Sequence, residues 1–128
     1  MEFTEYISKK KEVYSLLLNY IESDSESKEE FQELIACLKN QEIFQVKEQI
    51  LDFLHLISKI EQNHFKNSYF YDKILKVIQY IIKEKKVPIS NLEIFQIYEP
   101  NIRILHLILQ KEIIIPDDKI MQIIFEKK

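Results

Sequence analysis

One segment of this chain occurs twice. Residues 40–57 and residues 91–108 align without a gap, and ten of the eighteen aligned positions are identical. Each copy carries Glu-Ile-Phe-Gln near its start and closes on Leu-His-Leu-Ile. A repeated segment of this kind is typical of stacked helical units, because each unit is too small to bury its apolar face alone. Stacks of this type usually bind other proteins, so the repeat favours an all-α fold with an interaction role.

The composition is that of one folded domain with little attraction for polyanions. The chain has 128 residues, of which 46% are hydrophobic and 30% charged, so it can bury an independent core. The formal net charge is −3, and Arg103 is the one arginine among 18 basic residues. Base readout depends largely on arginine forks, so no nucleic-acid partner is predicted. No uncharged apolar run approaches the roughly 18 residues of a membrane span, so no membrane partner is predicted either.

Glycine does not occur in this sequence. This excludes the glycine-dependent phosphate loop, the dinucleotide fingerprint and the glycine-flanked nucleophile elbow, which serve several large enzyme classes. An AT-rich coding sequence accounts for much of the bias, because Ile, Lys and Asn are abundant while Ala occurs once. The exclusion of these sites holds whatever its cause. We therefore predict no enzymatic activity, no cofactor and no metal.

Cys37 is the single cysteine, which leaves no intramolecular disulfide and is consistent with a reducing compartment. Its neighbours Leu34, Ile35 and Leu38 predict a buried thiol. The N-terminus lacks a basic start followed by an apolar run, so no signal peptide is expected. Together these features predict a cytoplasmic protein.

Helical spacing of apolar residues dominates the first two thirds of the chain. The pattern predicts helices over residues 3–21, 28–39, 43–60 and 69–85. The third of these has the broadest apolar stripe and is expected to lie centrally. A serine and a glutamate three residues apart, Ser27 and Glu30, form a capping-box pattern at the start of the second helix. The acidic segment before this serine is expected to be a solvated loop.

Shorter helices are expected further on. Ser90 and Glu93 form a second capping-box pattern, for a helix that must end just before Pro100 because proline lacks an amide donor. Asn101 is expected to cap a further helix that continues to about Lys111.

Residues 113–115 are predicted to be extended without a strand partner, and residues 116–118 to open a last helix. The predicted fold is therefore all-α, with about seven antiparallel helices in a single domain over 1–128. Four longer helices are expected over 1–85, and short helix pairs over 90–128. The helical bundle is thus expected to become an α-solenoid in its second half.

Histidine is the residue type that most invites a catalytic or metal-binding role. His55 and His106 occupy equivalent positions of the two copies, and equivalent positions of a solenoid lie in neighbouring rows. Neither has a complete ligand set at helical spacing. We expect each ring to pack at a helix interface, with one nitrogen bonded to a backbone carbonyl, rather than to bind a metal. Ser58 follows His55 by three residues, but no oxyanion donor loop accompanies this pair.

Aromatic residues cluster over residues 65–71 and recur in the second copy of the repeat. Such residues either form a core or stack on single-stranded RNA, and the helical spacing with few neighbouring lysines favours a core. Tyrosine often lies at an interface with its hydroxyl in water, and a terminal helix exposes apolar side chains to a neighbour. The predicted partner-binding residues are Tyr69, Tyr71, Tyr98, Ile120, Ile124 and Phe125.

Several runs in the sequence resemble the helical N-terminal region of large ankyrin-repeat protein families in protist genomes. The resemblance covers nearly the whole chain and is closest from Leu54 onward. It is carried by Phe53-Leu54-His55-Leu56-Ile57-Ser58-Lys59-Ile60, Asn63-His64, Phe70, Glu93-Ile94-Phe95, Asn101, Arg103-Ile104-Leu105 and Ile113-Ile114-Ile115-Pro116-Asp117.

In that family the helical region precedes a row of ankyrin repeats, so the resemblance implies a cap or docking module and transfers no catalytic residue. It also implies that the short helix pairs over 90–128 are ankyrin-like. The Thr-Pro-Leu-His signature and the turn glycines of a true ankyrin repeat are missing here. Because the sequence ends where the ankyrin repeats of that family would begin, the chain is expected to be a fragment or a stand-alone relative. The expected function is a non-enzymatic protein–protein interaction module, the N-terminal cap of an ankyrin-type solenoid. The alternative is a structural subunit of a cytoskeletal or self-associating assembly.

Overall fold

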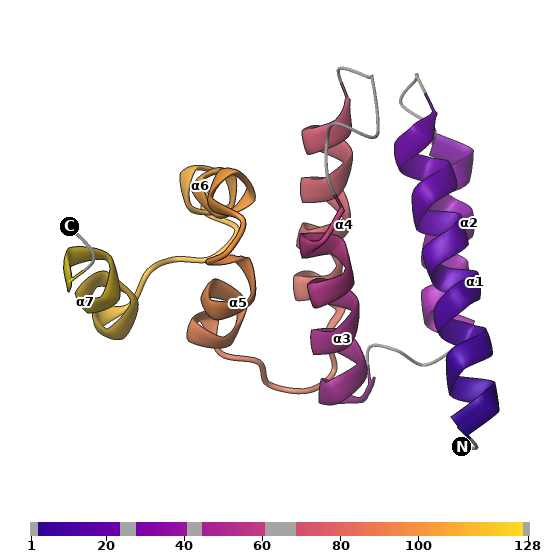
Figure 1. The fold of residues 1–128 in the computed structure, drawn as a ribbon, viewed down its shortest axis with the longest axis horizontal. Coiled ribbons are helices and arrows are strands. Elements are labelled where there is room, and N and C mark those ends of the chain that lie inside the picture. Colours follow the sequence, from indigo (N-terminus) through magenta and orange to yellow (C-terminus); the bar gives the residue numbers. More distant parts are fainter. Residues whose placement is uncertain (1–2, 24–27, 41–44, 61–68, 127–128) are drawn as a thin grey trace.

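The computed structural model describes residues 3–23, 28–40, 45–60 and 69–126, and the regular structure in these ranges is helical (Figure 1). The prediction of an all-α fold is confirmed. The first four helices have 12 to 20 residues and the last three have 8 or 9, as the spacing predicted. The helices are α1 (Phe3–Glu22), α2 (Lys28–Asn40), α3 (Lys47–Ser58), α4 (Phe70–Glu84), α5 (Asn91–Tyr98), α6 (Ile102–Gln110) and α7 (Asp118–Glu126).

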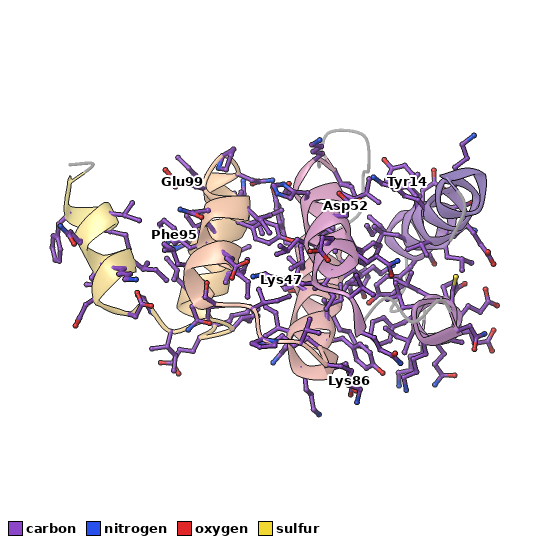
Figure 2. All side chains as sticks on the ribbon, turned by 90° about the horizontal axis from the view of Figure 1, so that it is seen from below. Tyr14, Lys47, Asp52, Lys86, Phe95 and Glu99 are labelled. Carbon is purple, nitrogen blue, oxygen red and sulfur yellow. The ribbon has the colours of Figure 1, made fainter. Side chains whose placement is uncertain are left out.

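Successive helix pairs are stacked along the longest axis of the molecule (Figure 1). α1 packs on α2, α3 on α4 and α5 on α6, while α7 lies at the opposite end from the first pair. Between the pairs, α3 contacts α5 and α5 contacts α7, whereas α4 contacts α6. The stack therefore has a row of first helices, α3–α5–α7, beside a row of second helices, α4–α6. Side chains fill the spaces between the layers (Figure 2).

One cluster of buried apolar residues connects all the layers, from Val13 in α1 to Ile120 in α7. α3 contributes Ile50, Leu54 and Ile57, none of which is more than 1% exposed. Removal of such side chains from water contributes roughly 25 cal/mol per Å² of apolar surface and is the main stabilising term. α3 contacts both α4 and α5, in agreement with the central position predicted from its broad apolar stripe.

The sequence repeat does not coincide with the structural repeat. The gapless alignment places α3 of the first copy opposite α6 of the second, with Pro100 opposite Gln49. In the stack, α3 packs beside α5 instead. Proline has no amide donor, so the second copy breaks between α5 and α6 at Pro100, whereas the aligned Gln49 of the first copy lies inside α3. The gapless alignment therefore pairs two helices that do not occupy equivalent places in the stack.

Side-chain caps fix the starts of the last three helices. Ser90 Oγ accepts a hydrogen bond from the amide of Glu93 at 3.1 Å, and the Ser90 amide donates to Glu93 Oε1 at 3.2 Å, which completes the predicted capping box. Asn101 Oδ1 caps α6 at 3.3 Å, also as predicted, and Asp117 Oδ1 caps α7 at 3.0 Å. The other predicted capping box, at Ser27, lies outside the described residues.

The C-terminus of α6 is closed without glycine. Glu112 takes the left-handed conformation, with φ of 56°, that glycine usually supplies at this position. Its amide donates to the Leu109 carbonyl at 3.2 Å, and the Ile113 amide donates to the Ile108 carbonyl at 3.0 Å. These two bonds form a complete Schellman motif. Because Glu112 has a Cβ atom, it bears the steric cost of the left-handed conformation that glycine would avoid.

Replacement of Glu112 by glycine is therefore expected to raise the free energy of unfolding by about 0.5–1 kcal/mol. This estimate balances the relief of left-handed strain against the greater entropy that glycine gives the unfolded chain. Urea unfolding followed by circular dichroism measures the difference. Lys111→Gly is the matched control, because Lys111 has φ of −87° and gains nothing from glycine. Equal effects of the two substitutions would contradict the proposed strain.

The C-terminus of α1 is closed by a lysine from another helix. Lys73 of α4 is 3% exposed, and its Nζ donates to the carbonyl oxygens of Tyr20 at 2.8 Å and Ser23 at 2.5 Å. The ammonium lies 5.2 Å from the centre of the Tyr20 ring. α1 has no basic residue in its own last turn. Lys73 therefore supplies both the missing donors and the positive charge that a helix C-terminus favours.

The segment between α6 and α7 is non-helical and pairs with no strand in the described ranges, as predicted for residues 113–115. Ile114 is buried, and Asn91 Nδ2 fixes the segment by donating to the Ile115 carbonyl at 3.1 Å. Within the described residues, no helix combines the length and the apolar character needed to cross a membrane.

Candidate functional site

Two of the six predicted partner-binding residues lie in the core, so their prediction is corrected. Tyr98 is 0% exposed, and its hydroxyl donates to the Leu54 carbonyl of α3 at 2.9 Å. The sequence argument placed this hydroxyl in water, but a backbone acceptor inside the stack satisfies it. Ile120 is also 0% exposed, because it forms the inner face of α7 in the row of first helices.

The other four predicted residues keep accessible surface. Tyr69 is 38% exposed and Phe125 is 59% exposed, whereas Tyr71 and Ile124 are half-buried. Arg103 of α6 lies over the Tyr71 ring, with 4.8 Å between the guanidinium carbon and the ring centre. These residues lie in two separate parts of the molecule, and each part is considered in turn.

The outer face of α7 is the first candidate surface. Met121, Ile124 and Phe125 are spaced by three and four residues, so they share one face of the helix, here named the terminal edge. Met121 is 38% exposed and Phe125 is 59% exposed, while Ile120 on the neighbouring face is buried. α7 thus has two apolar faces, one covered by the stack and one in water.

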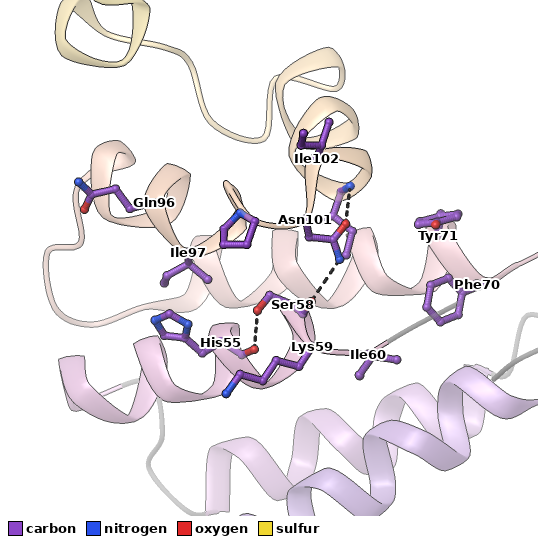
Figure 3. Close-up of a pocket in the computed structure, with 12 residues that line it drawn as sticks. His55, Ser58, Lys59, Ile60, Phe70, Tyr71, Gln96, Ile97, Asn101 and Ile102 are labelled. Carbon is purple, nitrogen blue, oxygen red and sulfur yellow. Dashed lines mark hydrogen bonds between the residues drawn. The ribbon is translucent and has the colours of Figure 1, made fainter. Parts of the chain in front are cut away.

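The second candidate surface is a groove between the α3–α4 and α5–α6 pairs (Figure 3). Its volume is about 630 Å³, within the range of ligand pockets. The C-terminus of α3, the N-terminus of α4 and the α5–α6 junction converge on it. This central groove is lined by His55, Ser58, Lys59, Ile60, Phe70, Tyr71, Gln96, Ile97, Pro100, Asn101, Ile102 and Ile104.

Asn101 fixes the shape of the central groove. Its Oδ1 caps α6, and its Nδ2 donates to the Ser58 carbonyl at the end of α3 at 3.1 Å (Figure 3). One amide therefore satisfies the N-terminus of one helix and the C-terminus of another. The Ser58 hydroxyl donates to the His55 carbonyl at 2.6 Å, within its own helix. This bond is backbone capping, and it gives the Ser58–His55 pair no nucleophilic geometry.

A second hollow of about 270 Å³ adjoins the central groove along the α3–α5 seam. It shares His55, Gln96 and Ile97 with the larger groove. Glu93 lies at its other end, where Lys47 Nζ approaches the carboxylate to 3.0 Å. The Lys47 and Ser90 contacts lower the pKa of Glu93, so this carboxylate remains charged and paired.

Neither histidine of the repeat is used as predicted. His55 and His106 are both exposed, so the expectation that each ring packs at a helix interface is wrong. His55 lines the central groove, whereas His106 is not part of that lining. Within the described residues, no group of three or more His, Cys, Asp or Glu side chains is placed to hold a metal ion. His64 lies outside the described residues.

Cys37 is 8% exposed, which confirms the predicted buried thiol. Burial raises the pKa of the thiol, and the charge and hydrogen bonding of Glu12 raise it further. A thiol with a raised pKa is a poor nucleophile at neutral pH, so Cys37 serves as a packing residue.

The chain was compared with protein-family models, curated proteins and solved structures, and no match was found in any of these three comparisons.

Proposed function

We propose that this chain is a non-enzymatic protein–protein interaction module whose docking surface is the terminal edge. The observation that carries the proposal is that α7 presents Met121 and Phe125 to water, at 38% and 59% exposure, while Ile120 is buried on its other apolar face. Two apolar faces on one helix are typical of a position between neighbours.

The stack itself indicates what the terminal edge accepts. α5 packs on α3 and α7 in its own row and on α6 in the second row. α7 occupies the next place in the row of first helices. A second helix placed beside α7 as α6 is placed beside α5 would contact both α6 and α7. A helix with an apolar stripe in that place would cover Met121 and Phe125 and would extend the row α4–α6.

Short helices favour a further repeat as the occupant. α5, α6 and α7 have 8, 9 and 9 residues, and non-helical segments that contain a proline join each to the next. Stacked pairs of such short helices are the units of ankyrin-type solenoids, in agreement with the resemblance of the sequence. We therefore propose that the chain caps an array of ankyrin-type repeats.

The proposal is tested by extending the full chain after Lys128 with the second helix of a consensus ankyrin repeat and one complete repeat. The extended protein is expected to unfold in a single transition, at a Tm above that of the chain alone. Phe125→Glu in the extended protein should separate the transitions of chain and repeats. Lys119→Glu, an exposed change on the same helix, is the control and should leave one transition.

A self-associating assembly is the competing function for the same surface. In that case the unextended chain would increase in size with concentration in sedimentation velocity experiments, and Phe125→Glu would abolish the increase. A size that is constant across dilution, together with a cooperative extended protein, supports the cap. Independent unfolding of the chain and the added repeats would contradict the cap.

A further inference from the structure

The central groove has a charge pattern opposite to that of the whole chain. The chain has a formal net charge of −3, with histidine counted as neutral, yet Lys59 is the one formally charged side chain among the described residues of the groove lining. Its side chain is exposed, as is that of the neighbouring His55. No carboxylate belongs to this part of the lining. Lys59 thus gives the groove a positively charged side chain on an acidic protein, which favours an anionic occupant.

Arg103 adds a second fixed cation at the rim. Its guanidinium lies over the ring of Tyr71, which lines the groove, with 4.8 Å between the guanidinium carbon and the ring centre. Stacking on the ring restricts the side chain, so less entropy is lost when the guanidinium binds a carboxylate. Asp72 follows Tyr71 in α4 and is exposed, but it is not part of the lining.

The same rim exposes the most accessible large aliphatic side chain in the described part of the molecule. Ile102, at the start of α6, is 76% exposed and stands above the groove in Figure 3. Pro100 is also exposed, and Tyr71 is half-buried. An apolar side chain of an occupant would cover these three residues, and its burial would give the contact its affinity.

We propose that the central groove binds an acidic peptide segment that carries a bulky apolar side chain. The apolar side chain lies against Ile102 and Tyr71, and flanking carboxylates meet Lys59 and Arg103. This site is separate from the terminal edge, so it adds a second partner surface to the proposed function.

The test uses a fluorescein-labelled ten-residue peptide, with four aspartates on each side of a central Leu-Phe pair. Binding to the full chain is followed by fluorescence anisotropy, and the site is mapped by ¹H–¹⁵N chemical shifts. The peptide is expected to saturate the chain, to shift amides of residues 55–60 and 101–104, and to bind more weakly as salt increases. A peptide with lysine in place of aspartate, and one with Ala-Ala in place of Leu-Phe, should each bind at least about tenfold more weakly.

Lys59→Glu and Ile102→Ala change exposed residues, so the fold should be retained, and each is expected to weaken the acidic peptide at least about tenfold. Lys111→Glu and Ile115→Ala are the matched controls outside the groove, and they should leave its affinity unchanged. The proposal is overturned if the acidic peptide does not saturate, if its shifts map elsewhere, or if Lys59→Glu binds it equally well. Binding of a uridylate oligonucleotide in place of the peptide would also overturn it. The extension experiment does not involve the groove, so failure of one proposal leaves the other standing.

Discussion

Replacement of Lys73 by methionine is expected to lower the free energy of unfolding by about 2–4 kcal/mol. Methionine preserves most of the volume but removes the donor to the Tyr20 and Ser23 carbonyls. A buried acceptor that loses its partner costs about 1–3 kcal/mol, and two are affected here. Relief from burying the lysine charge offsets part of this loss.

The expected fall in Tm is roughly 10 °C for a domain of this size. Lys83→Met is the matched control in the same helix, because Lys83 is exposed, and its effect should remain within about 0.5 kcal/mol. Denaturant unfolding gives both values. If Lys73→Met were as stable as Lys83→Met, the hydrogen bonds from Lys73 to the C-terminus of α1 would not contribute to stability. In Lys73→Met, amide hydrogen exchange in the last turn of α1 should become faster. This increase would show that the loss of stability arises at the C-terminus of α1.

Tyr98→Ala is expected to destabilise the chain by about 3–5 kcal/mol, the largest effect of a single side chain predicted here. The fully buried ring lies between the layers of α3 and α5, and its hydroxyl bonds to the Leu54 carbonyl. Tyr98→Phe keeps the ring and loses only the hydrogen bond, so it should cost about 1–2 kcal/mol. A loss below about 1 kcal/mol for Tyr98→Ala would contradict the packing of α5 on α3.

The Tyr98→Phe variant is also expected to differ from the unmodified chain in how its stability changes in alkaline solution. Burial raises the pKa of Tyr98 well above 10 and that of Tyr20 to about 12, because the phenolate is disfavoured inside the stack. The stability that follows from these shifts is present below pH 10 and is lost as the pH rises through the folded-state pKa values. Tyr98→Phe should therefore show a smaller loss of stability from pH 10 to pH 12 than the unmodified chain. Equal pH dependence would contradict a buried hydroxyl.

Much of the helical order could be predicted from local chemistry. The capping box at Ser90, the cap at Asn101 and the break at Pro100 are determined by residues within three positions of one another. Apolar spacing located the buried stripes of α3 and α4 for the same reason. Ile120, however, was assigned to the surface because spacing identifies an apolar face without showing which neighbour covers it.

Contacts between distant residues were not predictable in this way. Lys73 lies 50 or more residues from its acceptors, and no local pattern marks it as buried. The missing glycine was a signal that helix C-termini needed other solutions, and both Lys73 and Glu112 provide them. The central groove could not be predicted either, because it forms where three separate parts of the chain meet. The sequence repeat gave a misleading register, since identity of residues does not fix which helices become neighbours.

Hydrogen exchange of α7 tests the central claim most directly, by comparing the chain alone with the chain extended by a helix and one consensus ankyrin repeat. If the terminal edge accepts a neighbouring helix, the amides of α7 should be protected at least about tenfold more in the extended protein. Phe125→Glu should remove this additional protection, whereas Lys119→Glu should preserve it. If α7 exchanges at the same rate in both proteins, the terminal edge is not a docking surface and the proposed function is wrong.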